Sequence, residues 1–281
     1  MKIITKFSIL QKEIKKGKKQ GKIVGFVPTM GALHQGHLSL IRRARRENDL
    51  VIVSIFVNPA QFGPKEDYAK YPRNLRLDAQ LCGQEKTDII FYPGVKEMYP
   101  SGYNTYVTVE RLSDVLCGKY RPGHFKGVAT VVTKLLNIIN PDSAYFGQKD
   151  AQQAVIIKKL AGDLNMPVKI KIMPTLRERD GLALSSRNVY LSPAERKDSL
   201  VLFQALKLAK DLIRGGQKDA TKVTAKMRHL IEKKKTAKID YVSIVGLNDL
   251  APLKKITGFC LIAEAVWFGK TRLIDNIIIG S

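Results

Sequence analysis

Residues 23–37 read IVGFVPTMGALHQGH, and this stretch decides the fold. The continuous apolar run Ile23–Pro28 predicts a buried strand that ends at the proline. In His37–Asn48 the leucines and isoleucine recur at helical spacing and the arginines fall on the opposite side, which predicts an amphipathic helix. A strand that leads directly into a helix is the unit from which parallel α/β sheets are built.

The same alternation continues to about residue 175, because short apolar runs keep following runs of helical period. Three prolines mark residues 58–72 as a loop. The further predicted strands are Leu50–Val57, Asp88–Tyr92, Ser143–Phe146 and Val168–Met173, and the predicted helices are Asn74–Lys86, Val128–Ile139 and Ala151–Leu164.

The pattern changes after Arg179. Two helical runs, Ala194–Arg214 and Ala220–Lys235, are separated by a turn at Gly215–Gly216. Three apolar runs then predict an antiparallel sheet, at Ile239–Val245, Phe259–Phe268 and Arg272–Ile279. The predicted fold is therefore α/β: a Rossmann-like doubly wound parallel sheet in a nucleotide-binding domain at 1–176, and a smaller α+β domain at 177–281 that closes over the site.

Composition excludes several classes of protein. The chain has 281 residues, of which 44% are hydrophobic and 26% charged, a globular balance. No apolar run approaches the roughly 20 residues of a membrane-spanning helix, and the lysine-rich N-terminus does not resemble a secretory signal. Cys82, Cys117 and Cys260 show no metal-ligand spacing and are expected to be buried thiols. We expect a cytoplasmic protein without a membrane partner.

The formal charge of +23, from 48 basic and 25 acidic residues, allows two interpretations. One is a nucleic-acid partner, and the other is a lysine-rich surface. No helix-turn-helix, RNA-recognition or zinc motif is visible, and aromatic residues make up only 7% of the chain. We therefore expect no nucleic-acid partner.

The turn after the first strand holds the strongest candidate site. It is neither G-x-G-x-x-G nor a Walker loop, and instead carries His34 and His37 on either side of Gly36 at the start of a helix. Two imidazoles at this spacing point the same way and can donate hydrogen bonds to phosphate oxygens beside a positive helix terminus. The alternatives are a structural histidine pair or a metal pair, although the motif contains no carboxylate.

Three other segments carry polar side chains at predicted strand or domain ends. Asn58 and Gln61 offer uncharged groups for a small polar substrate, although amides are common in loops. Gly147–Gln153 carries Lys149 and Gln153 one turn apart, for phosphate and substrate, or is simply a basic helix start. Arg177–Asn188 contains Ser–Ser–Arg, which suits phosphate capture by a closing lid, or is a solvated turn.

Together these segments closely resemble the pantoate–β-alanine ligases, a family of nucleotidyltransferases with HxGH-type signatures. The matching segments are PTMGALHQGHLSLI, VSIFVNPAQFG with YPR, RPGHFKGVATVV, YFGQKDAQQ, DGLALSSRN with YLS, and RLIDN at 272–276. The resemblance implies ATP-dependent ligation of pantoate and β-alanine through a pantoyl adenylate, with release of pyrophosphate and AMP. No protein nucleophile is needed for that chemistry, and none is evident.

The resemblance also implies roles for individual residues. His34, His37, Lys149 and Arg187 would act on the phosphates in catalysis. Pantoate and β-alanine would meet Gln61 and Gln153, with Asn58 and His124 as further pocket residues. The implied ATP-binding residues are Met30, Gly31, Ala32, Leu33, His34, Gln35, Gly36, His37, Gly147, Gln148, Lys149, Asp150, Leu176, Leu184, Ser185, Ser186 and Arg187.

Magnesium is expected with ATP, and Asp78 is a candidate ligand or a surface carboxylate. The family is usually homodimeric, with Leu50–Val57 as a candidate interface strand. Ala60 and Leu176 depart from residues common in the family, without affecting the implied reaction. The alternative is another nucleotidyltransferase, which would share the histidine motif without the amides at Asn58, Gln61 and Gln153.

Overall fold

A computed structural model describes residues 1–64 and 66–280. The contacts between Cα atoms divide the chain into two compact units. Unit 1 comprises Met1–Ser113, Arg121–Gly147 and Ile156–Pro174, and unit 2 comprises Asp114–Tyr120, Gln148–Val155 and the chain from Thr175 onward. Two short segments before residue 175 thus group with unit 2, whereas the sequence suggested a single boundary at 176; the domain arrangement proposed from sequence stays a prediction.

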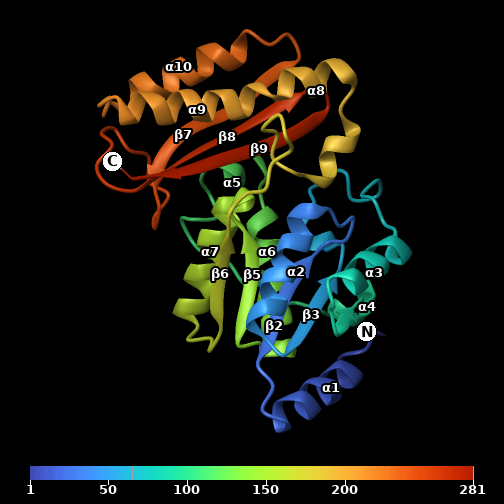
Figure 1. The fold of residues 1–281 in the computed structure, drawn as a ribbon. Coiled ribbons are helices and arrows are strands. Elements are labelled where there is room, and N and C mark those ends of the chain that lie inside the picture. Colours follow the sequence, from blue (N-terminus) through green and yellow to red (C-terminus); the bar gives the residue numbers. More distant parts are fainter. Residues whose placement is uncertain (65, 281) are drawn as a thin grey trace. The chain divides into compact units, whose positions relative to one another are not determined.

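Unit 1 is built on a parallel sheet of six strands (Figure 1). Their order is β1-β4-β3-β2-β5-β6. Every neighbouring pair is parallel, as buried apolar strands joined by helices require. The strands are β1 (Lys2–Ile4), β2 (Val24–Thr29), β3 (Leu50–Ile55), β4 (Ile89–Phe91), β5 (Ser143–Gly147) and β6 (Lys169–Met173).

Helices flank this sheet. On one face, Ile41 and Ala44 of α2 and Cys82 of α3 belong to a buried cluster with Val27 and Val53 of the central strands. The helices before residue 175 are α1 (Phe7–Lys19), α2 (Gln35–Glu47), α3 (Leu75–Gln84), α4 (Val95–Met98), α5 (Cys117–Tyr120), α6 (His124–Ile139) and α7 (Ala151–Asp163), with short 3₁₀ turns η1 (Pro59–Gln61) and η2 (Gln148–Asp150).

The strand order reverses between β2 and β5. From β2 the chain builds outward through β3 and β4, and then returns to place β5 on the other side of β2. In doubly wound sheets ligands bind at such a reversal, outside the carboxyl ends of the strands. The predicted α/β fold is confirmed, and the turns after β2, β3 and β5 start from one edge of the sheet.

The suggestion that Leu50–Val57 forms a dimer interface is wrong for the strand itself. All six residues of β3 are buried. The strand pairs with β2 on one side and β4 on the other, so neither edge is available to a second chain.

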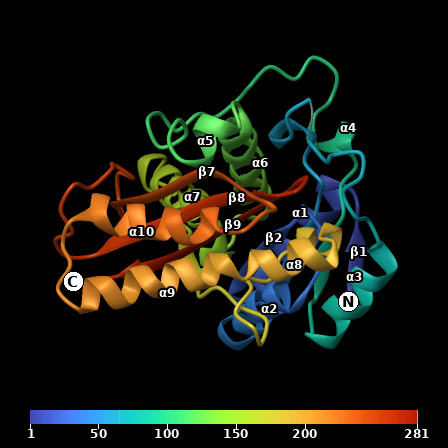
Figure 2. The ribbon, with the colours of Figure 1, turned by 90° about the horizontal axis from the view of Figure 1, so that it is seen from above.

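Unit 2 contains an antiparallel sheet in the order β7-β8-β9. The strands are β7 (Ala237–Gly246), β8 (Cys260–Phe268) and β9 (Thr271–Ile279). Figures 1 and 2 show α9 (Val201–Arg214) and α10 (Ala220–Glu232) lying along one face. Leu206 and Met227 of these helices share a buried core with Ile262 and Val266 of the sheet.

The single helix predicted over Ala194–Arg214 is instead two helices, α8 (Pro193–Ser199) and α9. Ser192 caps α8 in a capping box with Glu195. The hydroxyl of Ser199 donates to the carbonyl of Arg196 at 2.8 Å, and such a side-chain bond competes with the helical ladder. The helical period continues across this break, which is why the pattern alone does not reveal it.

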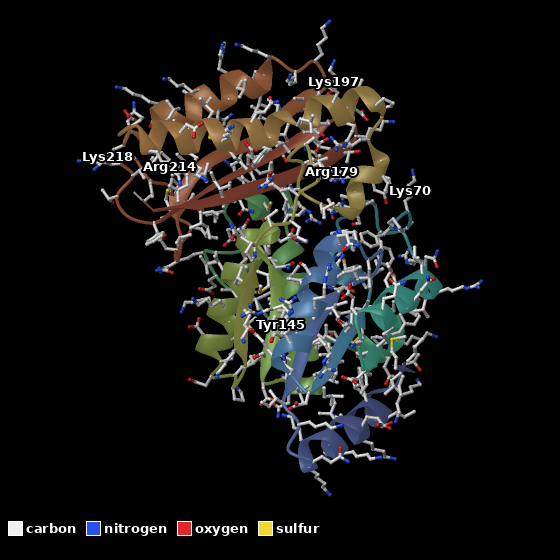
Figure 3. The ribbon with its side chains drawn as sticks, in the orientation of Figure 1. Lys70, Tyr145, Arg179, Lys197, Arg214 and Lys218 are labelled. Atoms are coloured by element: carbon white, nitrogen blue, oxygen red, sulfur yellow. The ribbon has the colours of Figure 1, made fainter. Side chains whose placement is uncertain are left out.

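The lysine-rich N-terminus contains β1 and α1, which the sequence patterns did not identify. In α1, Leu10 and Ile14 are buried while the last turn carries lysines, so the basic residues occupy its outer side. Figure 3 shows Lys70, Lys197 and Lys218, all exposed, extending outward, whereas Tyr145 lies within the sheet of unit 1. In the described residues we find no helix whose length and apolar character would let it span a membrane.

Candidate active site

The turn after β2 is held in an unusual conformation by a buried carboxylate. Gly31 and Ala32 both have positive φ, +82° and +49°. Asp78, only 2% exposed at the start of α3, accepts the N–H of Ala32 at 3.0 Å and of Leu33 at 2.8 Å. A Cβ at Gly31 would lie 2.9 Å from the same carboxylate, so only glycine fits there. Burial raises the pKa of Asp78, an effect that the two N–H donors partly offset.

His34 and His37 form the cap of α2. The Nδ1 atom of His34 accepts the N–H of Gly36 at 3.1 Å, and the Nδ1 atom of His37 accepts the N–H of His34 at 3.4 Å. The two ring centroids are 4.1 Å apart. Because Nδ1 accepts in each ring, a neutral imidazole carries its proton on Nε2. The cap therefore fixes two rings with Nε2–H as the donor at a helix N-terminus, where anions are favoured.

Gln61 connects this turn with the turn after β3. Its amide nitrogen donates to the sulfur of Met30 at 3.1 Å, and its amide oxygen accepts from Asn58 at 3.1 Å. Asn58, 1% exposed, also donates to the carbonyl of Gly127, and its oxygen accepts from Tyr99 and Ala60. The hydrogen-bonding capacity of Asn58 is thus filled within the protein, so it orders the turn around Gln61.

A second network fixes the backbone of Gln61. The ring nitrogen Nδ1 of His124 donates to the Gln61 carbonyl at 2.8 Å, since a carbonyl can only accept. Nε2 of the same ring lies 2.9 Å from Nη1 of Arg121, which can only donate to it. Arg121 is paired through two hydrogen bonds with Glu66, at 2.7 and 2.6 Å. Burial would raise the pKa of Glu66, but Arg121 holds it below its ordinary value.

Gly127 in α6 allows this turn to approach closely. A Cβ at this position would lie 2.1 Å from the carbonyl oxygen of Ala60, which is impossible without moving the backbone. Together with the bond from Asn58 to its carbonyl, Gly127 therefore joins η1 to the start of α6.

In unit 2, the segment after β5 presents Lys149 and Gln153, both half-buried. The Lys149 ammonium lies 3.6 Å from the carboxylate of Asp150. Gln152, the neighbour of Gln153, points elsewhere: it accepts from the backbone of Cys117 at 2.9 Å and donates to Val115 at 2.7 Å. Gln152 therefore anchors the start of α7.

The segment from Leu176 to Leu184 folds back on itself. Leu184 N–H donates to the carbonyl of Leu176 at 3.0 Å, and Glu178 N–H donates to the carbonyl of Leu182 at 2.8 Å. Ser185 then caps a 3₁₀ turn, η3 (Ser186–Tyr190), by accepting the N–H of Arg187. Leu176 thus contributes to the hairpin through its carbonyl, and Leu184–Arg187 leave the hairpin as a short ordered turn.

The predicted site residues therefore fall into two ordered groups. Unit 1 brings Met30, the histidine pair, Asn58, Gln61 and His124 into connected turns. Unit 2 holds the segment after Gly147 and the segment 176–187. The sequence assigned no role to Glu66, Tyr99, Asp275 or Asn276, although RLIDN at 272–276 contains the last two. Their contacts depend on partners far away in the chain.

Asp78, the candidate magnesium ligand, is already engaged within the protein. Both of its oxygens accept backbone N–H groups, and the side chain is buried. Across residues 1–64 and 66–280, no group of three or more His, Cys, Asp or Glu side chains is arranged to hold a metal ion. In the structure Asp78 supports the turn that precedes His34, and its role as a magnesium ligand stays a prediction.

The chain is similar to proteins of known function over nearly its whole length. The pantoate-beta-alanine ligase family matches residues 2–278. The pantothenate synthetase of Caldicellulosiruptor saccharolyticus is 54% identical over 279 residues, with 99% of each chain covered.

Two solved structures are similar over nearly the whole chain. The pantothenate synthetase of Thermus thermophilus has a TM-score of 0.94 and 44% identity, with 99% of each chain covered. The pantoate-beta-alanine ligase of Francisella tularensis, solved with beta-gamma ATP and beta-alanine, has a TM-score of 0.80 and 37% identity, covering 99% of this chain and 97% of its own. From its sequence and its fold alike, the chain belongs to the pantoate–β-alanine ligase family.

Proposed function

We propose that the two groups of residues described above carry the family's reaction, the ATP-dependent ligation of pantoate and β-alanine. The pantoate carboxylate attacks the α-phosphate of ATP, which forms a mixed anhydride and releases pyrophosphate. The amine of β-alanine then attacks the acyl carbon, and AMP leaves as pantothenate forms. The observation that carries this proposal is the His34–His37 cap in the turn after β2, at the reversal of strand order, where Met30 of the same turn accepts from Gln61.

The first step needs groups that neutralise charge on the leaving pyrophosphate. We assign this role to the Nε2–H donors of His34 and His37, to the N-terminus of α2, and to Lys149 and Arg187. The other ATP contacts that we propose come from residues 30–37 and 147–150, from Leu176, and from 184–186. Exclusion of water from the loaded site would protect the adenylate from hydrolysis.

We assign Gln61 and Gln153 to pantoate and β-alanine. Gln61 donates to a thioether sulfur, which is a weak acceptor. A hydroxyl or carboxylate oxygen of the substrate would be a better acceptor. Replacing the Met30 sulfur by a substrate oxygen as the partner of the Gln61 amide is therefore favourable. Asn58 and His124 serve this pocket by fixing Gln61 rather than by direct contact.

We propose that magnesium arrives with ATP, held by phosphate oxygens and water, as is usual for this ion in nucleotide sites. The contacts of Asp78 support this view, since its oxygens are engaged by the turn after β2. We also retain from the family resemblance a homodimer in the cytoplasm. Light scattering of the purified chain tests the dimer.

The test of the function is AMP release. Purified protein with ATP and magnesium should release AMP only when pantoate and β-alanine are both present. Pantoate alone should support exchange of labelled pyrophosphate into ATP, which reports the first step. AMP release without pantoate, or with an unrelated acid in its place, would overturn the proposal in favour of another nucleotidyltransferase.

The pocket assignment has a separate test. Gln61→Ala should raise the KM for pantoate with a much smaller change in the KM for ATP. Gln11→Ala, on the exposed side of α1, is the matched control and should change neither. A defect in Gln61→Ala confined to ATP would refute the assignment.

A further inference from the structure

Strand β9 carries two adjacent buried polar residues, Asp275 and Asn276, which are 2% and 3% exposed. Neighbouring side chains on a strand point to opposite faces of the sheet. The pair can therefore reach two different segments from one position. Both segments contain residues assigned above to ATP.

Asn276 binds the segment that carries Lys149. Its amide nitrogen donates to the carbonyl of Gln148 at 2.9 Å and to the carbonyl of Lys149 at 2.8 Å. Its amide oxygen accepts from the side chain of Gln148 at 3.3 Å. The backbone on both sides of the Lys149 Cα is thereby tied to β9, and this sets the direction in which the lysine leaves η2.

Asp275 binds the hairpin that leads to Arg187. Its carboxylate is paired at both oxygens with the guanidinium of Arg177, with one contact of 2.9 Å. Arg177 also donates to the carbonyl of Gly181 at 3.1 Å, and its guanidinium stacks 4.5 Å from the ring centre of Phe203. One arginine thus spans the two sides of the 176–184 hairpin and fixes it to the strand.

Glu264 is a second buried carboxyl group beside this ion pair. It lies opposite Asp275 on β8 and is fully buried, and within the described part of the chain neither of its carboxyl oxygens has a hydrogen-bond partner. Burial and the nearby Asp275 raise the pKa of Glu264 well above its ordinary value. Asp275, rather than Glu264, makes the bidentate contact with the guanidinium of Arg177.

We propose that Asp275 and Asn276 are positioning residues, which hold Lys149 and the Leu184–Arg187 turn at a fixed spacing for the phosphates of ATP. This inference rests on the proposed function, because it takes the assignment of Lys149 and Arg187 from there. Neither residue is assigned a contact with substrate. Their effect is to order in advance two segments that are far apart in the sequence, which reduces the entropy that ATP binding must overcome.

The test compares Asn276→Ala with Ile279→Val, a matched control on the same strand that trims a methyl group from the core of unit 2. Steady-state kinetics with ATP, pantoate-dependent pyrophosphate exchange and melting temperature are measured for each. Asn276→Ala should lower kcat/KM for ATP by roughly 10–100-fold, as expected when a reacting group is misplaced. Ile279→Val should change it less than about threefold at a similar melting temperature.

A double variant separates positioning from general destabilisation. If Asn276 acts through Lys149, then Asn276→Ala in a Lys149→Ala background should cost less than about threefold, because the group that it orients is already gone. Equal losses in both backgrounds, or an Asn276→Ala enzyme that behaves like Ile279→Val, would overturn the proposal. A Lys149→Ala enzyme with normal turnover would instead overturn the role assigned to Lys149, and the proposal with it.

Arg177→Lys keeps the test open if Asn276→Ala does not fold. Lysine retains the positive charge beside Asp275 but cannot form the bidentate hydrogen bonds of the guanidinium. We expect a several-fold rise in the KM for ATP with the KM for β-alanine unchanged. An unchanged KM for ATP would refute the positioning role of the Asp275–Arg177 ion pair.

Discussion

The contacts of Asp78 lead to a quantitative prediction for Asp78→Asn. The variant keeps the side-chain volume but presents an NH₂ group to one of the two N–H groups that the carboxylate now accepts. A buried N–H left without an acceptor costs about 1–3 kcal/mol. The free energy of unfolding should fall by about that amount, because the side chain is 2% exposed and water cannot replace the lost bond.

The effect on catalysis should be larger than the effect on stability. In Asp78→Asn one of these two bonds is lost, so Ala32 is held less firmly at φ +49° and can relax toward the right-handed region. His34 follows two residues later, so the cap of α2 moves with this turn. A displacement of about 1 Å in a reacting group can cost about 100-fold in rate. We expect a loss of that order in pantoate-dependent pyrophosphate exchange.

Asp142→Asn is the matched control. Its carboxylate accepts the N–H of Val24 at 2.7 Å, at the opposite end of the same strand β2, where it is exposed. It should leave the exchange rate within about threefold of the unchanged enzyme, since a surface change of this kind costs little. An Asp78→Asn enzyme no slower than Asp142→Asn would refute the reasoning.

Magnesium distinguishes the two roles considered for Asp78. If the carboxylate were a metal ligand, a higher magnesium concentration would restore part of the lost rate. If it supports the turn, the loss should be the same across the magnesium titration. Recovery at high magnesium would therefore return Asp78 to the metal site.

Three further outcomes are expected. His37→Ala should slow adenylate formation by roughly 10²–10³-fold, the loss typical of one transition-state donor. The control His229→Ala, on the exposed side of α10, should leave pyrophosphate exchange unchanged. Equal exchange rates in the two variants would refute the role of the cap. Gly127→Ala should raise the KM for pantoate at least about tenfold, because its Cβ would collide with the Ala60 carbonyl and move Gln61. An unchanged KM for pantoate would show that η1 can shift without displacing the Gln61 side chain. In the folded chain the pKa of Glu264 is raised, so its contribution to stability is complete below the ordinary value of 4.5 and is lost as pH rises through the folded pKa. Glu264→Gln should therefore flatten the decline in the urea-unfolding free energy above that pH, and an unchanged slope would contradict the raised pKa.

The parts of the fold that depend on local pattern could be predicted. The strand at Ile23–Pro28 and the helix after it are present as β2 and α2, because apolar period and the proline are properties of the segment itself. The helix α1 could not be found in this way, since lysines outnumber its apolar residues and only Leu10, Ile14 and Gly17 are buried. Its stability depends on packing that the local sequence does not reveal.

The candidate site shows the same division between local and distant information. The pairing of His34 with His37 follows from their spacing on one helical turn, and the rings do lie together. The support of that turn by Asp78 could not be predicted, because Leu33 and Asp78 are 45 residues apart in the sequence. An acidic residue in the first turn of a helix is usual for electrostatic reasons alone, so it gives no signal of a distant partner.

Hydrogen-bond capacity separates residues that contact substrate from residues that position others. The Asn58 side chain donates to Gln61 and Gly127 and accepts from Ala60 and Tyr99. A contact with substrate would therefore break a hydrogen bond of about equal strength. The Gln61 amide instead donates to the thioether sulfur of Met30, which is a weaker acceptor than a substrate oxygen. The two amides sit three residues apart and look equivalent in the sequence. Their different bonding makes Gln61 the residue to exchange partners and Asn58 the residue that keeps it in place.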